Sequence, residues 1–419
     1  MQAAATTIDI TPLKEVELGC SPLDGPEWVI ESRPEIGLVA LWIGDGAPLV
    51  FASVDALYVG TQIRAALEEA SAGIVPPENL IVGATHTHAA PMTDGTKPAL
   101  GSPDPEHMQM ITDRVRAAMA DLLNPANRQD ATLEAARGKG KFAVNRRQVR
   151  KFVFKRPNFE WNVFRKAPDM RGPRDDIFTV VKVVGAGGAP LAVLWNYACH
   201  PVDNVRPRTV STHFPGIVRQ QLRDQFQEDL PVLYFQGFSG DVRPRPTAGP
   251  LIPPGGLYRI YVRLMQGRFF VPMKEDAYRK WCGKIAALVQ KLVGKTRRIP
   301  ADSYRAERVS RDREEFVSPQ GAPATFQAVT IGPDFGLVAA SAEMMTAYAP
   351  QVRRDLRRRY VFCVGCADDT FGYAPTEAML GQGGYEDTLF LEHFDLDAVN
   401  PQIEANIRSA IGAVISATR

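Results

Sequence analysis

The chain contains only six histidines, and three of them lie where two apolar segments end. His86 and His88 follow the apolar run 80–84, and His200 follows the run 191–197. Residues two positions apart in an extended chain point to the same side, so both imidazoles of the His-Thr-His segment can face one cavity. Open α/β sheets bind ligands at the carboxyl ends of their strands, and imidazole is the commonest protein ligand for zinc. The pattern therefore indicates a metal site at one edge of a sheet.

Each of these histidines also has a structural interpretation, because a histidine at a strand end is often only a hydrogen-bonded core or surface group. His213 precedes a helix whose first turn contains Pro215, and this position is typical of a capping or surface residue. We interpret His107 and His393 as structural. Glu343 follows another apolar run and opens a helical pattern, where the helix dipole alone favours an acidic residue. If it faces the histidines, it completes a metal site.

Short apolar runs that predict strands alternate with longer segments that predict helices. This alternation, with an antiparallel turn at the glycine-rich residues 185–188, predicts the α/β class: a large mixed sheet flanked by helices. We expect residues 1–419 to form a single domain. The predicted strands are 37–43, 49–53, 80–84, 178–184, 191–197, 232–235, 326–331, 336–340 and 360–364. The predicted helices are 62–70, 107–123, 215–225, 277–293, 344–356 and 401–416.

Composition and charge argue against several classes of protein. The 49 basic and 47 acidic residues give a net charge of +2, so the chain lacks the charge excess of a nucleic-acid or anionic-membrane binder. No apolar stretch reaches the roughly 18 residues of a membrane-spanning helix. The N-terminus has no secretory pattern and the five cysteines are sparse, so we expect a cytoplasmic protein. A leader removed before this numbering begins would leave the same pattern.

Two segments and one cysteine pair stand out in composition. Residues 139–174 interleave basic and aromatic side chains, as single-stranded nucleic-acid binders do. The balanced charge favours instead a large loop or insertion with inward aromatics and solvated basic ends. Residues 243–272 are rich in proline and glycine and predict a loop beside a site. Cys363 and Cys366 form a lone Cys-x-x-Cys at the end of an apolar run, which favours buried thiols over redox or metal chemistry.

An ordered set of short motifs resembles the N-terminal catalytic domain of the neutral/alkaline, non-lysosomal ceramidases. Each motif is weak by itself, but together they span nearly the whole chain, from residue 8 to about residue 386. The motifs are IDITP at 8–12, ATHTH at 84–88, NR at 145–146, NYACHP at 196–201, FPG at 214–216, GDV at 240–242, Glu343, GYAPT at 372–376 and GYE at 384–386.

This resemblance implies a zinc-dependent hydrolase, since the family holds one zinc ion with two histidines, a glutamate and a tyrosine. The reaction implied is attack on an amide or ester carbonyl by metal-activated water, with the oxyanion stabilised by nearby donors. The implied ligands of one zinc ion per chain are His86, His200, Glu343 and Tyr373. The implied catalytic residues are His88, which handles protons or substrate, and Arg146 and Tyr385, which hold the scissile group.

Three features depart from the family pattern. Arg243 stands where ceramidases have the serine of GDVSPN, so any step that needs this hydroxyl is lost, whereas a mechanism based on zinc-activated water survives. His213 replaces an acidic residue before the aromatic-Pro-Gly turn, and it either adds a metal ligand or alters the rim of the pocket. The chain ends soon after the last motif, so we expect no C-terminal β-sandwich domain.

Several arginines near the motifs suggest what the substrate is. Arg243 and Arg245 follow the GDV motif, and Arg206 follows His200; if they join Arg146, the pocket is cationic. Guanidinium groups suit carboxylates and phosphates, so we predict a small polar or anionic substrate rather than ceramide. The alternative for each arginine is an exposed or ion-paired surface residue.

The partner expected is therefore a small-molecule substrate, with neither nucleic acid nor membrane, and the oligomeric state stays open. The alternative function is a non-catalytic metal- or ligand-binding descendant of the same fold.

Overall fold

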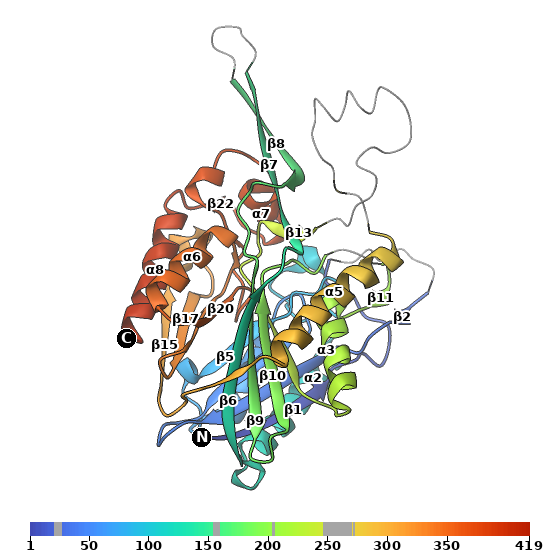
Figure 1. Cartoon of the computed structure of the whole chain (residues 1–419). Coiled ribbons are helices and arrows are strands. Elements are labelled where there is room, and N and C mark those ends of the chain that lie inside the picture. The colour runs from blue at the N-terminus through green and yellow to red at the C-terminus, as the bar shows by residue number, and fades with distance from the viewer. Residues whose placement is uncertain (21–26, 154–159, 203–205, 246–269, 271–272) are drawn as a thin grey trace.

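The structure is a computed structural model, and it describes residues 1–20, 27–153, 160–202, 206–245, 270 and 273–419. Its described part contains two sheets that share an apolar core, with helices packed on their outer faces (Figure 1). This architecture confirms the α/β class, the large mixed sheet and the flanking helices that the sequence predicts. It adds a second, smaller sheet.

The larger sheet has nine strands among the described residues, in the order β12-β10-β9-β6-β1-β3-β4-β5, with β14 paired to β6. Its two ends are parallel pairs, β10 with β12 and β4 with β5, and the strands between them are antiparallel. The strands are β1 (Gln2–Asp9), β3 (Glu35–Trp42), β4 (Leu49–Val54), β5 (Leu80–Ala84), β6 (Gln129–Lys139), β9 (Ile177–Gly185), β10 (Pro190–Tyr197), β12 (Val232–Gln236) and β14 (Arg297–Ile299).

Twist brings the two ends of this sheet together. Followed strand by strand, β5 runs antiparallel to β10. Each step rotates the strand direction by roughly 20–25°, so the six steps from β10 to β5 turn it by roughly 120–150°. The sheet also curls, because β12 contacts β4 and β5, and the Ser53 hydroxyl of β4 donates to the Tyr234 carbonyl of β12 at 2.6 Å. Strands from opposite ends of the sheet therefore meet at their carboxyl ends.

The smaller sheet has the order β15-β17-β18-β20, and only its last pair, β18 with β20, is parallel. The core between the sheets includes Leu41, Phe51 and Leu233 from the larger sheet and Leu337 and Phe362 from the smaller one. Burial on both faces explains why these strands are almost continuously apolar. The strands of the smaller sheet are β15 (Tyr304–Arg311), β17 (Ala324–Ile331), β18 (Phe335–Ala340) and β20 (Tyr360–Val364).

Helices cover the outer faces of both sheets. The first pair, α1 and α2, packs on one part of the larger sheet, and α3 and α5 pack on another part. The outer face of the smaller sheet is covered by α6 and α8. The helices are α1 (Thr61–Ser71), α2 (Pro105–Leu123), α3 (His213–Phe226), α5 (Glu275–Val293), α6 (Ala349–Leu356), α7 (Phe390–His393) and α8 (Ile403–Ala417).

Every predicted strand and helix occurs, but one helix begins later than the sequence predicts. Residues 344–356 were expected to be helical throughout, whereas Glu343 and Met344 form the short strand β19 (Glu343–Met344). This strand exists because it pairs with β21 (Tyr373–Ala374), a distant partner that helical periodicity does not reveal. The helix α6 begins only at Ala349.

The segment 139–174 is a β-hairpin rather than a loop. Strands β7 (Ala143–Val153) and β8 (Glu160–Asp169) pair antiparallel and project from the top of the molecule (Figure 1). Their β-branched and aromatic residues favour extended backbone. Side chains 149–167 lie outside the described part, as do residues 246–269 and 271–272 of the predicted loop 243–272. The predicted antiparallel turn at 185–188 is confirmed between β9 and β10.

Short strands connect the remaining parts. The strand β13 (Val242–Pro244) pairs with the base of β7. The other short pairs are β2 (Val29–Ile30) with β11 (Thr209–Val210), and β16 (Val317–Ser318) with β22 (Ala398–Val399).

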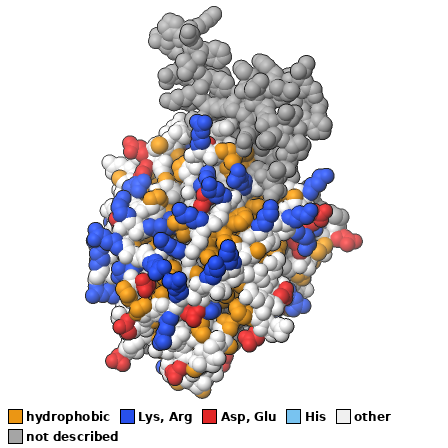
Figure 2. Space-filling view, in the orientation of Figure 1, with side chains coloured by type: hydrophobic (Ala, Val, Ile, Leu, Met, Phe, Trp, Pro, Cys, Tyr) orange, Lys and Arg blue, Asp and Glu red, His pale blue; other side chains and the backbone are white. Residues whose placement is uncertain are grey.

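The surface carries both charged and apolar side chains, and the Cys-x-x-Cys pair is buried. Figure 2 shows basic, acidic and apolar side chains intermixed over one face of the molecule. Among the described residues, no helix is both long enough and apolar enough to cross a membrane. Cys363 and Cys366 are buried and unbridged, and burial raises the pKa of Cys363 to about 12.

Candidate metal centre

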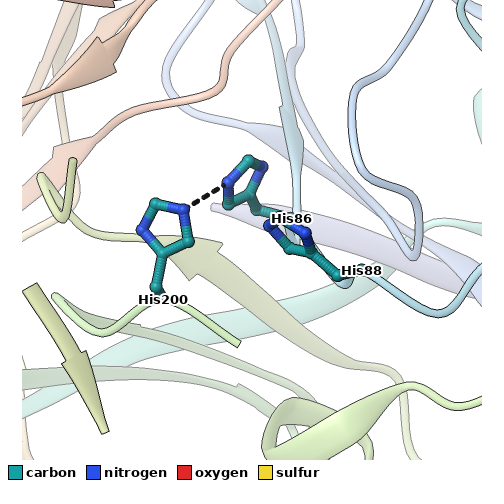
Figure 3. Close-up of side chains that lie close together, drawn as sticks. All are labelled: His86, His88 and His200. Atoms are coloured by element: carbon teal, nitrogen blue, oxygen red, sulfur yellow. Dashed lines mark hydrogen bonds between the residues drawn. The ribbon is translucent and has the colours of Figure 1, made fainter. Parts of the chain in front are cut away.

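Two histidines from opposite ends of the larger sheet meet in the interior. His86 follows β5 and His200 follows β10, and both are buried. Their Nε2 atoms lie 3.0 Å apart, as the dashed line in Figure 3 shows. His86 adopts a left-handed φ of 63°, so the chain turns sharply where it leaves the strand. The curl of the sheet thus creates a contact between residues 114 positions apart.

The main chain determines which ring nitrogen of each histidine faces the centre. The Nδ1 of His86 lies 2.9 Å from the Leu57 carbonyl, and the Nδ1 of His200 lies 3.0 Å from the Ser239 carbonyl. A carbonyl only accepts hydrogen bonds, so each Nδ1 must carry a proton. In a neutral imidazole the other nitrogen, Nε2, then has no proton and carries a lone pair that can accept a hydrogen bond. The two Nε2 atoms therefore face each other as acceptors, and they need a cation or a shared proton between them.

A buried carboxylate completes this arrangement. The Oε2 of Glu343, on β19, lies 3.4 Å from His86 Nε2 and 3.3 Å from His200 Nε2. Among the described residues this oxygen has no hydrogen-bond partner, whereas its other oxygen accepts a 2.6 Å bond from the Tyr58 hydroxyl. Two imidazole lone pairs and a carboxylate oxygen are the donors that zinc prefers. The residues present therefore fit a divalent cation.

Tyr373 lies beside this carboxylate because β19 and β21 pair with Glu343 directly opposite Tyr373. The Tyr373 oxygen accepts a 3.1 Å hydrogen bond from Arg146 Nη2. Burial and the neighbouring Glu343 raise the pKa of Tyr373 well above its ordinary value, although Arg146 acts to lower it. The phenol becomes an anionic donor only if a cation joins Arg146 in stabilising the phenolate.

The charges in the centre are strongly coupled. Burial by itself would raise the pKa of Glu343, but His86 and His200 hold this pKa well below its ordinary value. Burial by itself would lower the pKa of His86, but Cys366 and Glu343 raise it well above 6.5. Burial and Arg146 lower the pKa of His200 to about 4. Without a cation, a proton on His86 would therefore take the place between the two Nε2 atoms that a cation can occupy.

His88 lies next to this pair and contributes a third imidazole. Its ring centroid is 5.0 Å from that of His86 and 5.6 Å from that of His200 (Figure 3). One nitrogen of each of the three rings lies within 4.8 Å of the others, so the three histidines also form a group that can hold a metal ion. Burial, followed by the charges of His86 and His200, lowers the pKa of His88 well below 6.5, so the ring is neutral. Its buried Nε2 has no hydrogen-bond partner among the described residues.

Arg146 and Tyr385 lie on the side of the centre where Tyr373 is. Arg146 Nε donates to Glu386 Oε1 at 2.7 Å, while Arg147 Nη1 donates to the other oxygen of Glu386 at 2.6 Å. The ring of Tyr385 packs edge-on to Tyr373, with the centroids 5.3 Å apart. The hydrogen bonds of Arg146 thus hold protein groups, and its charge is shared between Tyr373 and Glu386.

The three arginines predicted to bind substrate each have a different contact in the structure. Arg206 is 45% exposed and pairs with Glu31 at 2.6 Å. The guanidinium of Arg243 lies 4.5 Å from the ring centroid of Phe270. Arg245 is half-buried, and its backbone N–H donates to the Phe142 carbonyl. Their role in substrate binding stays a prediction.

His213 is neither a surface residue nor a capping residue, contrary to the interpretation from the sequence. It is 2% exposed, begins α3 with a left-handed φ of 49°, and provides no capping hydrogen bond. Its Nδ1 lies 3.0 Å from the hydroxyl of Thr87, the residue between His86 and His88. A proline in the first turn indicates where a helix begins, but it does not indicate what packs against that end. Here the segment His86–His88 packs against it.

The other two histidines have contacts outside the group of three imidazoles. His107 is buried in α2, where Asp104 caps its backbone N–H, and the His393 ring lies 5.5 Å from that of Tyr385.

Sequence reasoning missed two residues that hold the centre together. Tyr58 donates to Glu343, and Glu386 binds Arg146. Glu386 belongs to the GYE motif, which pointed to Tyr385 instead. Tyr58 has no motif, but it follows β4, the parallel neighbour of β5. Its place at a strand's carboxyl end was the signal that could have identified it.

Comparison with solved structures shows that the chain has a neutral ceramidase-like fold. A crystal structure of neutral ceramidase from Pseudomonas aeruginosa matches 99% of this chain and 74% of its own, with a TM-score of 0.75 and 15% identity. A ceramidase complexed with C2 matches 99% of this chain and 75% of its own, with a TM-score of 0.74 and 14% identity. No protein-family model and no curated protein matches the sequence. The resemblance seen in the sequence motifs is thus confirmed at the level of the fold.

Proposed function

We propose that this chain is a zinc-dependent hydrolase that cleaves an amide bond, or a related ester, in a small polar or anionic substrate. The observation that carries the proposal is the pair of imidazole lone pairs, from His86 and His200, facing each other and the Glu343 carboxylate at 3.0–3.4 Å. Such a buried cluster of acceptors is stable only with positive charge at its middle. The ceramidase structures that share the fold support hydrolysis as the reaction class.

The residues of the chain divide the chemistry among them. His86, His200, Glu343 and Tyr373 would hold the cation. A cation held there supplies Lewis acidity, which polarises a carbonyl oxygen and lowers the pKa of water towards neutrality. His88 is neutral, and its buried Nε2 is free to accept a proton.

The oxyanion that develops at a cleaved carbonyl would be stabilised from the oxygen side of the centre. Arg146 supplies positive charge there, and Tyr385 supplies a hydroxyl close to Tyr373. Because Arg146 is already bonded to Glu386 and Tyr373, its contribution is electrostatic and preorganised.

The preference for an anionic substrate depends on Arg243. This residue lies on β13, directly after a turn that is tied to the strand bearing Glu343: the Gly240 N–H donates to the Met344 carbonyl at 2.8 Å. Asp241 in the same turn accepts from the Thr346 N–H at 2.8 Å. These two hydrogen bonds tie the turn before Arg243 to the segment that bears Glu343. A guanidinium at this position would suit a carboxylate or phosphate.

The test combines metal content with activity. Purified protein should contain about one zinc ion per chain, hydrolyse members of a panel of N-acyl amides and esters, lose activity on chelation and regain it with zinc. One zinc ion per chain without hydrolysis of any panel member would favour the non-catalytic metal-binding descendant. Failure to bind zinc or any other divalent cation would refute the proposal.

A further inference from the structure

We infer that Tyr58 is a positioning residue of this centre, which turns the Glu343 carboxylate so that one oxygen faces the two histidines. The inference rests on the proposed metal-dependent function and extends it to a residue outside the ligand set. Tyr58 is 2% exposed and Glu343 is 3% exposed, so both groups are shielded from bulk water.

The contact selects between the two carboxylate oxygens. The Tyr58 hydroxyl donates its single proton to Oε1 at 2.6 Å, and Oε2 is left 3.3–3.4 Å from the histidine nitrogens. Rotation about the last torsion of glutamate is soft, so packing alone does not determine which way the carboxylate plane faces. A short hydrogen bond to one oxygen does determine it.

Tyr58 is itself held by groups that do not depend on Glu343. Lys97 Nζ lies 5.2 Å from the centroid of the Tyr58 ring, and the Phe394 ring packs against it edge-on at 5.7 Å. Lys97 is fixed in turn by ion pairs with Asp94 at 2.5 Å and Asp369 at 3.2 Å. The hydroxyl is therefore presented from a rigid ring, so it can act as a reference point for the carboxylate.

The residue next to Tyr58 performs the same task for a histidine. Leu57 accepts the Nδ1–H of His86 with its carbonyl, while Tyr58 donates to Glu343. Two consecutive residues after β4 thus orient one nitrogen donor and one oxygen donor, which come from different sheets. Groups that orient metal ligands typically change metal affinity by about 10–100-fold when they are lost.

The experiment measures zinc affinity by competition with a chromophoric chelator, on the full chain. Tyr58→Phe removes only the hydroxyl and keeps the ring, and we expect zinc to bind about 10–100-fold more weakly. Tyr304→Phe is the matched control: its hydroxyl donates to the Ala47 carbonyl at 2.5 Å, and it has no contact with the centre. We expect wild-type affinity for the control, and unchanged affinity of Tyr58→Phe would overturn the inference.

A double-mutant cycle separates positioning from a general structural effect. If Tyr58 acts through Glu343, Tyr58→Phe should cause no further loss of zinc affinity in a Glu343→Ala background. An equal loss in both backgrounds would mean that the hydroxyl supports the fold and not the carboxylate. If wild-type protein binds no zinc, the proposed function fails and this inference fails with it. If wild type binds zinc and Tyr58→Phe binds it equally well, only the inference fails.

Discussion

The nitrogen half of the centre, His86 and His200, and the oxygen half, Glu343 and Tyr373, are held in place by different kinds of group. Each histidine is oriented by a main-chain carbonyl, at Leu57 or at Ser239. A main-chain carbonyl is present whatever the side chain, so substitution at these two positions changes the orientation of the rings only if it moves the backbone. The nitrogen half is therefore built into the path of the chain.

The oxygen half is held by side chains instead. Tyr58 orients Glu343, and Arg146 donates to Tyr373. Both of these contacts can be removed by a single substitution that leaves the backbone unchanged. Substitutions of the supporting side chains can therefore change the orientation of Glu343 and Tyr373 in small steps. The orientation of His86 and His200 changes only when the backbone itself moves.

The largest effect is expected from removing a nitrogen ligand. His86→Ala should weaken zinc binding by roughly 100–1,000-fold, about a quarter of the free energy of a four-ligand zinc site, and should abolish hydrolysis. Zinc competition and turnover assays measure both quantities. His107→Gln is the control, since it replaces another buried histidine whose charged neighbours are Asp104 and Arg114. Near-normal zinc binding by His86→Ala would disprove its role as a ligand.

The next largest effect is a dependence of stability on pH. It is expected from His213, which contacts Thr87 between His86 and His88. Burial lowers the pKa of His213 to about 4 from an ordinary 6.5. Between these values the unfolded chain binds a proton that the folded chain does not, so stability is full above pH 6.5 and falls as the pH falls towards 4. The loss amounts to about 3 kcal/mol.

Urea unfolding of metal-free protein between pH 4.5 and 7 tests this expectation. His213→Asn tolerates the left-handed backbone and lacks the titrating ring, so its stability should depend less steeply on pH. Identical slopes for the variant and wild type would show that His213 titrates normally.

A smaller effect is expected from weakening the oxygen half. Arg146→Lys keeps the charge but cannot bond both Tyr373 and Glu386 with a planar fork, so zinc affinity and turnover should fall by about 10-fold. Arg147→Lys is a matched control because Arg147 donates to the other oxygen of the same Glu386. Equal losses in the two variants would place the effect in Glu386 and not in the tyrosine.

The smallest effect is expected at the edge of the site. Arg243→Ser should lower kcat/KM for anionic substrates by a few-fold to about 10-fold relative to neutral ones, since one charge-assisted hydrogen bond contributes about 1.5 kcal/mol or less at a half-buried position. Paired measurements on a neutral amide and its carboxylate analogue give the ratio. An unchanged ratio would argue against recognition of an anion by Arg243.

Much of the fold could be predicted because its signals are local. The run 80–84 coincides with β5, and the run 360–364 coincides with β20. A buried strand typically has the sequence pattern of a short apolar run between polar turns. The strands that the sequence did not predict include β1, β6 and β15, whose polar residues interrupt any apolar run, and β19, which is two residues long and exists only through its partner β21. An element this short has no period of its own to detect.

The residues that meet at the candidate centre could also be named in advance, but the groups that contact them could not. His86, His200 and Glu343 each stand at the end of an apolar run, where a chemically active residue is conspicuous. Tyr58 follows β4 and Glu386 belongs to the GYE motif, but neither signal shows which side chain these residues contact. Their function depends on which distant side chain they meet.

The sequence by itself determined the helices, the apolar strands and the chemical identity of the residues that meet at the candidate centre, because periodicity and residue type are properties of short segments. Only the tertiary structure decided that β5 and β10, six strands apart in the sheet, deliver His86 and His200 to one point. The physical reason is cumulative: each pair of strands adds a small twist, and only the sum over the whole sheet makes antiparallel ends converge. The short strand β19, which follows β18 of the second sheet, then places Glu343 against both rings.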